Sequence, residues 1–302
     1  MTNVAQEIAE SSAQAGAAQA GRRPKSKTSG IIFKLAVGWL VFITGLTIAG
    51  WLFGDAIPLL EDPFARDREK ISAGPSWSNL MGNASFGEDV LSQVVEGGKI
   101  SLRIGFLVTL IGMAVGGGMG LLAGFYRGWV DAVVRVLINV TLSVPALLLV
   151  IFIVTIRDQE LTTVIFALSL LAIPALARIV RASTLQVADR EYVKAAQVLG
   201  VRRSKILVRE VVPNVMPTMI SFAFLTTGII IVVEGTLSFL GLSVPPPQIT
   251  WGNIIAEGRI KFAETPHMVV MPALVIFLTV LALNFVGDQL LKRYDIREAG
   301  IS

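Results

Sequence analysis

Long runs without a charged residue dominate this chain. Six are long enough to cross a membrane or nearly so, and they are Leu35–Gly54, Ile104–Tyr126, Val136–Ile156, Leu161–Ala177, Val211–Val233 and Thr265–Gly287. A helix of roughly 20 apolar residues crosses about 30 Å of hydrocarbon. The fourth run is shorter, but Arg178 and Arg181 can extend it by reaching to the interface. The pattern predicts an all-α membrane protein with six transmembrane helices.

A seventh charge-free run, Gly235–Ala256, contains Pro245, Pro246 and Pro247. Three consecutive prolines remove three backbone donors and cannot continue a helix. Lipid would leave such backbone unsatisfied. We therefore expect an external loop over residues 235–264 that packs on protein.

Composition supports a membrane location. The chain of 302 residues is 53% hydrophobic and 16% charged, which is too apolar for an ordinary soluble domain. It has no cysteine, so a disulfide or a thiolate–metal site is excluded. The net charge of +4 is modest and the basic residues flank the spans, so a nucleic-acid partner is not expected. The first 30 residues lack an apolar signal-peptide core and predict a cytoplasmic tail.

The Lys and Arg bias of the loops predicts the orientation. If the N-terminus is cytoplasmic, 18 of the 26 basic residues fall on the cytoplasmic side, and the C-terminus is cytoplasmic as well. We expect short helices over Trp77–Ser92. The predicted organisation is a disordered cytoplasmic tail (1–30), a first transmembrane helix (31–57), an external segment (58–99), a core of five transmembrane helices (100–293) with a cytoplasmic loop (184–213) and the external loop (235–264), and a cytoplasmic tail (294–302).

Glycines recur every four residues in the second predicted span, at Gly112, Gly116, Gly120 and Gly124. They share one helix face, where another backbone can approach closely. Ordinary helix packing is the favoured interpretation, and a sliding contact beside a conduit is the alternative. Pro145 and Pro174 predict bends in the third and fourth spans, which are either hinges or static kinks.

Candidate chemistry is sparse. Glu234 lies near the external end of the fifth span, where it serves either a structural hydrogen-bonding role or contact with a solute. The only histidine, His267, cannot build a zinc site without cysteine or clustered carboxylates. Gly97-Gly98-Lys99 is followed by Ile100, which lacks the hydroxyl of a phosphate-binding loop. We therefore expect no catalytic residue and no metal site.

A charged segment from Asp189 to Pro213 separates two spans. Asp189 is suited to cap a helix in which Tyr192, Ala195, Ala196 and Leu199 share a shallow face. Gly200 is suited to end that helix, and the chain can restart near Ser204. The face favours docking into a groove on another protein. The alternative is a helix lying on lipid headgroups, for which alanines are poor contacts.

The same segment resembles the EAA loop of permease subunits of ABC-type importers, with Lys194 in place of the usual Glu before Ala195-Ala196. Further strings resemble the dipeptide/oligopeptide/nickel permease family, in the type called C (DppC/OppC-like). These strings are Gly87 with Asp89–Ser92, Gly124–Asp131, Leu237–Leu242, Pro246-Pro247, Trp251–Asn253 and Glu257–Arg259.

The resemblance implies a type I ABC importer permease fold in the bacterial cytoplasmic membrane. Implied partners are a homologous second permease, two cytoplasmic ATPase subunits or domains that bind ATP and magnesium, an external solute-binding protein and the lipid bilayer; the chain itself would hold no cofactor. The solute would be a short peptide or a related compound such as nickel or glutathione. An ion-coupled secondary transporter and a membrane-embedded enzyme are the alternative functions.

The resemblance also implies two sets of functional residues. The coupling helix would lie within residues 189–207 and transmit ATPase closure to the spans. Its docking residues would be Asp189, Arg190, Glu191, Tyr192, Lys194, Ala195, Ala196, Leu199, Gly200, Arg202, Ser204 and Lys205. An external gate or a contact with the binding protein would involve Glu234, Trp251, Gly252 and Arg259.

Overall fold

The computed structural model describes residues 27–53, 57 and 60–299, with side chains from 30 to 293 within those ranges. The chain divides into two units, Met1–Leu35 and Ala36–Ser302. Of the first unit, residues 27–35 form the beginning of a helix. The predicted tail over residues 1–30 falls largely outside the described residues, and everything below concerns the second unit.

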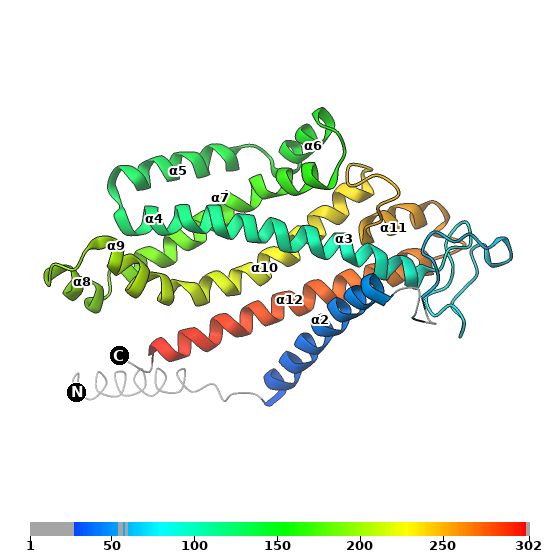
Figure 1. Cartoon of the computed structure of the whole chain (residues 1–302), viewed down its shortest axis with the longest axis horizontal. Coiled ribbons are helices and arrows are strands. Elements are labelled where there is room, and N and C mark those ends of the chain that lie inside the picture. The colour runs from blue at the N-terminus through cyan, green and yellow to red at the C-terminus, as the bar shows by residue number, and fades with distance from the viewer. Residues whose placement is uncertain (1–26, 54–56, 58–59, 300–302) are drawn as a thin grey trace, which may run out of the picture. The chain divides into compact units, whose positions relative to one another are not determined.

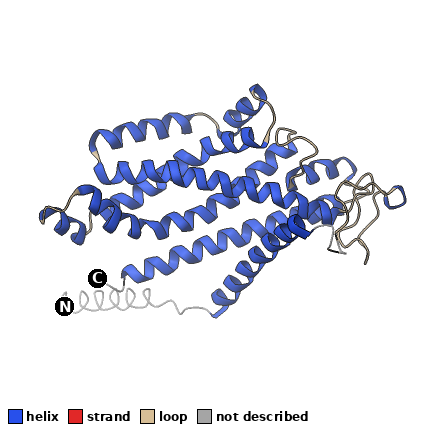
Figure 2. Ribbon diagram, viewed as in Figure 1, coloured by secondary structure: helices blue, strands red, loops and turns tan. Residues whose placement is uncertain are grey.

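The described residues form helices joined by turns and loops, without a strand (Figure 2). The helices are α2 (Lys27–Phe53), α3 (Val90–Ile111), α4 (Gly118–Tyr126), α5 (Gly128–Ser143), α6 (Ala146–Ile156), α7 (Leu161–Ala188), α8 (Glu191–Val198), α9 (Arg203–Ile206), α10 (Val212–Phe239), α11 (Trp251–Gly258) and α12 (His267–Ala299). Two π-helical segments, η3 (Gly112–Gly117) and η4 (Leu207–Val211), join α3 to α4 and α9 to α10. Short 3₁₀ turns occupy Arg68–Lys70 (η2) and Arg259–Lys261 (η5).

Five continuous helices are long and apolar enough to cross a membrane, among the residues described. They are Gly30–Phe53, Val90–Tyr126, Leu161–Ala188, Arg203–Phe239 and His267–Arg293. The predicted third span differs, because α5 and α6 meet at an angle of 80°. Pro145 disfavours a helical conformation at the residue before it, and Val144 is extended with φ −83° and ψ 130°. The bend expected at Pro145 is therefore a complete break, and the all-α prediction is confirmed with five spans, or six if this pair counts as one.

The long helices of residues 36–302 lie alongside one another in Figure 1, with α3–α4, α5, α7, α10 and α12 roughly parallel or antiparallel. The largest buried cluster joins α3, α7 and α10 through residues that include Ile104, Val164, Leu176 and Leu237. At one end of these helices lie α8 and α9, and at the opposite end lie α11 and the loop over residues 60–89. The two candidate sites therefore occupy opposite ends of the bundle.

Some predicted boundaries are wrong. Trp77–Ser92 forms turns instead of short helices until α3 begins at Val90, where the Asp89 side chain accepts hydrogen bonds from the Ser92 amide and hydroxyl, both at 2.7 Å. A side chain that satisfies these free donors fixes the helix start. Because α3 begins there, Val90–Lys99 belongs to a helix instead of the external segment. The predicted tail over 294–302 is helical as far as Ala299, since α12 continues past the apolar run.

Candidate functional site

The short helix α8 ends abruptly at a glycine. Gly200 has a φ of +75°, the left-handed conformation that glycine adopts without a Cβ penalty. Its amide donates to the Gln197 carbonyl at 3.0 Å, and the Val201 amide donates to the Ala196 carbonyl at 3.1 Å. This pair of bonds is the Schellman arrangement, which satisfies carbonyls at a helix C-terminus. The end of α8 therefore has a defined direction.

One buried side chain ties α8 to the rest of the chain. Val193 is fully buried in a cluster with Val187, Ile206 and Val211, and this is the only buried residue of α8. By contrast, Val198 is 88% exposed and Leu199 is 81% exposed. We call these two residues the apolar tip. An anchored base and an apolar tip open to the surroundings are the features of a protruding contact element.

The predicted α8 face is partly turned inward. Tyr192, Ala195 and Leu199 are exposed, whereas Ala196 is half-buried against the cluster that holds Val193. Sequence reasoning missed Val193 and Val198, although a buried valine between exposed charges was the available signal for the inner face. The other residues of the predicted docking set are exposed on α8, α9 and the adjoining turns, and they are Asp189, Arg190, Glu191, Lys194, Gly200, Arg202, Ser204 and Lys205.

Asp189 does not cap α8, contrary to the prediction. It lies at the C-terminal end of α7, and Arg190 occupies the N-cap position without a side-chain cap bond. The Asp189 carboxylate instead accepts a hydrogen bond from the Arg127 guanidinium at 2.7 Å. Arg127 stands at the turn from α4 to α5 with a φ of +56°. This ion pair joins two turns that lie 62 residues apart in the sequence.

A second ion pair links α5 to α7. The Asp131 carboxylate accepts two hydrogen bonds from the Arg181 guanidinium, one of them at 2.9 Å. Arg135 approaches the same carboxylate at 3.3 Å. Bidentate pairs of this kind fix orientation as well as distance. The pair therefore holds α5 against α7 next to the turn that carries Arg127.

The four predicted packing glycines lie against α7. A Cβ on Gly120 would lie 2.6 Å from the Ala177 carbonyl oxygen, and one on Gly124 would lie 2.7 Å from the Thr184 Cβ. One on Gly112 would lie 2.8 Å from a methyl of Leu176, and one on Gly116 would overlap the Ile173 carbonyl. No other residue fits this spacing without movement of the helices. The stripe sets a close contact of η3 and α4 with α7.

At the opposite end, Glu234 is enclosed by hydroxyl donors. It is 1% exposed. Its carboxylate accepts hydrogen bonds from Ser238 at 2.7 Å, from Ser243 at 2.8 Å and from Ser101 at 3.3 Å. The donors come from α10, the loop after it, and α3. A buried carboxylate requires such partners, and this geometry supports the structural role that the sequence left open.

The external loop is held by α11. Trp251 is fully buried, and its indole N–H donates to the Val94 carbonyl at 2.8 Å. A Cβ on Gly252 would lie 2.8 Å from the Gly235 Cα. Glu234, Trp251 and Gly252 thus face inward and offer no side chain to an external protein in this conformation. Arg259 is the exposed member of the predicted set, and it stacks on the Phe239 ring with 4.4 Å to the centroid.

Near the same end, burial and the Glu88 carboxylate raise the pKa of Glu257 on α11 above its usual range. Glu88 itself pairs with Arg66 at 3.3 Å. His267 is engaged structurally, with its Nε2 3.1 Å from the Asn83 carbonyl. In the parts of the chain that the structure describes, no three acidic or imidazole side chains gather as ligands for a metal ion.

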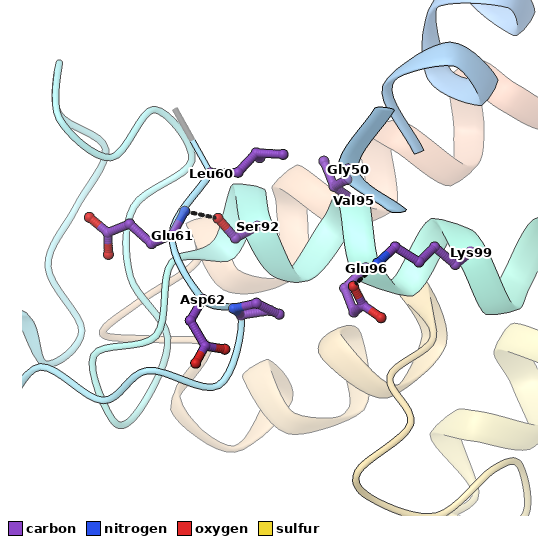
Figure 3. A pocket seen from close by; sticks show the side chains of 9 residues that line it. Gly50, Leu60, Glu61, Asp62, Ser92, Val95, Glu96 and Lys99 are labelled. Carbon is purple, nitrogen blue, oxygen red and sulfur yellow. Dashed lines mark hydrogen bonds and ion pairs between the residues drawn. The ribbon is translucent and has the colours of Figure 1, made fainter. Parts of the chain in front are cut away.

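A cavity of about 230 Å³ lies between the end of α2 and the start of α3 (Figure 3). Its polar side chains are engaged in local bonds. Ser92 accepts from the Glu61 amide at 2.9 Å, Lys99 pairs with Glu96, and the Glu61 carboxylate pairs with Lys70 at 3.2 Å. The hydrogen bond from Glu61 raises the pKa of Lys70. The arrangement favours a structural joint over a reactive site.

Comparison with known proteins gives a consistent result. Residues 116–298 match the family described as "Binding-protein-dependent transport system inner membrane component". The glutathione transport system permease protein GsiD of Pectobacterium atrosepticum is 36% identical over 229 residues, or 76% of each chain. GsiD of Escherichia coli O6:K15:H31 is 37% identical over 234 residues, covering 78% of this chain and 77% of that protein.

The fold is also similar to solved structures. A chain of the MetNI methionine ABC transporter in an inward-facing conformation aligns with a TM-score of 0.56 at 17% identity. The alignment covers 67% of this chain and 96% of that one. A second crystal form gives a TM-score of 0.55 at 16% identity.

Proposed function

This chain belongs to the family of binding-protein-dependent transport system inner membrane components, and from that membership we propose that α8 is the helix through which separate ATPase subunits move it. The chain is a permease subunit of an ABC importer and a multi-pass protein of the bacterial plasma membrane, as the sequence predicted. It is a transport subunit, and neither the ion-coupled carrier nor the membrane enzyme is favoured.

The observation that carries the proposal is the exposed apolar tip on an anchored helix. Val198 and Leu199 expose more than four-fifths of their surface at a capped helix end. An apolar contact of this kind gains free energy when it enters a groove on another protein. The alanines beside it would contribute little to binding lipid. A protein partner therefore explains the tip better than a membrane surface does.

The chain beyond α8 is suited to transmit motion. From Arg203 to Phe239 it is helical without a break, through α9, η4 and α10. Val193 fixes α8 to the base of this helix through Ile206 and Val211. A displacement of α8 by a closing ATPase would thus be passed to a span as a rigid-body movement between discrete states.

We also propose the remaining assembly and the class of solute. The permease would pair with a homologous second subunit, receive its solute from an external binding protein and dock two ATPases that hold ATP and magnesium. The solute would be a short peptide or a peptide-like thiol. Support for this class comes from the similar GsiD proteins, which are named as glutathione permeases.

Replacing the apolar tip tests the role of α8. The double variant Val198→Asp/Leu199→Asp should lose at least about 90% of the co-purifying ATPase, because two charges would enter an apolar groove. The variant Ile260→Asp is the control, since Ile260 is 81% exposed at the other end of the bundle. It should retain the ATPase. Normal attachment in the double variant would overturn the proposal.

The absence of cysteine allows a direct test of orientation. A single Val198→Cys variant should react with a membrane-impermeant maleimide in inside-out vesicles and be protected in intact spheroplasts. Bound ATPase should slow that reaction. Labelling from outside the cell would contradict both the orientation and the docking role.

A further inference from the structure

A second feature beside α8 suggests what the ATPase must supply. A cavity of about 280 Å³ lies between the α4–α5 turn, the end of α7, and the helices α8 and α9. Polar side chains form most of its lining, and they are Tyr126, Arg127, Asp189, Lys194, Gln197 and Arg203. The apolar lining residues Phe125 and Ala188 are both buried.

The charges of this cavity are unbalanced. Three cations, Arg127, Lys194 and Arg203, face one carboxylate, Asp189. That carboxylate is already bound to Arg127 at 2.7 Å. Among the residues that the structure describes, neither Lys194 nor Arg203 forms an ion pair. The cavity therefore keeps two cations that no internal acid neutralises.

The position of the cavity relates it to the apolar tip. Lys194 precedes Val198 by four residues, so the two share a face of α8. Arg203 follows the glycine turn and approaches from α9. A protein that covers the tip would consequently also cover the cavity.

We propose that this cavity receives an aspartate or glutamate side chain of the ATPase subunit, held between Lys194 and Arg203. This inference rests on the proposed docking role of α8. A carboxylate matches both the unneutralised charge and the polar lining. A phospholipid would also need an apolar channel for its chains beside the cations, and the two apolar lining residues here are occupied in the core.

The acid would act mainly in partner choice. Opposite charges guide encounter and fix register, whereas a like charge at the same position costs binding energy. An ATPase with a basic residue facing the cavity would be rejected. The apolar tip would supply affinity, and the cavity would select the correct ATPase and its rotation about α8.

Charge reversal tests the inference. The double variant Lys194→Glu/Arg203→Glu should hold the co-expressed ATPase subunits about tenfold more weakly at low salt. The attachment of the unsubstituted permease should weaken as salt rises, because salt screens the attraction. A single Arg209→Glu variant is the control, since Arg209 is exposed in η4 but does not line the cavity. It should bind nearly as well as the unsubstituted chain.

A charge swap separates the proposed partner from other anions. Lysine would replace each surface acid of the ATPase in turn, and one replacement should restore binding to the doubly reversed permease. Two results would overturn the proposal. One is undiminished binding by the doubly reversed variant. The other is a loss that no ATPase replacement restores and that follows phosphatidylglycerol content in nanodiscs, which would assign the cavity to lipid.

Failure of this inference can be distinguished from failure of the coupling role. If the tip variant Val198→Asp/Leu199→Asp loses the ATPase but the cavity variant does not, α8 docks without an acid in the cavity. If both variants keep the ATPase, the docking role itself is wrong.

Discussion

Two helices of eight residues, α11 and α8, lie at opposite ends of the bundle and are built in opposite ways (Figure 1). In α11, Trp251, Gly252, Ile254 and Gly258 are buried, and the polar groups nearby bind one another. In α8, Val193 is the one buried residue. The first helix closes the core of its own chain, whereas the second leaves apolar surface uncovered.

This difference indicates where the chain depends on itself and where it depends on a partner. Buried area stabilises the external end directly, at roughly 25 cal/mol per Å² of apolar surface removed from water. At the α8 end, the same contribution from Val198 and Leu199 is available only on binding. Substitutions at α11 should therefore reduce stability, and substitutions at α8 should mainly reduce assembly.

The largest effect on stability is expected at Trp251. Replacing it with alanine removes a fully buried indole and its hydrogen bond to Val94. The unfolding free energy should fall by about 3–5 kcal/mol, as measured by SDS titration in mixed micelles. Trp77→Ala is the matched control because Trp77 is 96% exposed, and it should change stability by less than about 0.5 kcal/mol. Equal losses in both variants would remove the distinction on which the comparison rests.

A smaller loss is expected at the contact of η3 with α7. Gly116→Ala would place a methyl group against the Ile173 carbonyl, so the helices must move apart. Overpacking of this kind costs about 1–3 kcal/mol. Gly118→Ala lies two residues along, with open space around its Cβ. It should be neutral or stabilising by up to about 1 kcal/mol. A neutral Gly116→Ala in the same titration would show that the contact is not tight.

The sequence predicted the spans well because hydrocarbon imposes a simple requirement of length and apolarity. It also predicted the glycine turn at Gly200, because a left-handed residue is a local property of the backbone. The break at Pro145 was only partly anticipated, since a proline within an apolar run either kinks a helix or ends it. The extended conformation of Val144 decides between these outcomes.

The sites were harder to predict because they depend on residues distant in sequence. The Arg127–Asp189 pair joins residues 62 positions apart, and the Ser101–Glu234 bond joins residues 133 positions apart. No periodicity of a single sequence encodes such pairs. The inner face of α8 was misassigned for a related reason, since Val193 is buried by Ile206 and Val211, which reach it only after the chain has turned at Gly200.

The smallest effect on stability, and the one most specific to α8, is expected at Gly200. A Cβ at this position would meet nothing within 4 Å, so any cost arises from the backbone, whose φ is +75°. Valine in this conformation costs roughly 1–2 kcal/mol and should undo the Schellman turn that directs the apolar tip. We expect Gly200→Val to insert into the membrane normally and to lose about tenfold in ATPase attachment. Asparagine tolerates left-handed geometry, so Gly200→Asn should retain most of the attachment. Co-purification of the ATPase measures both variants, and if valine binds as well as asparagine, the direction of the tip does not control docking.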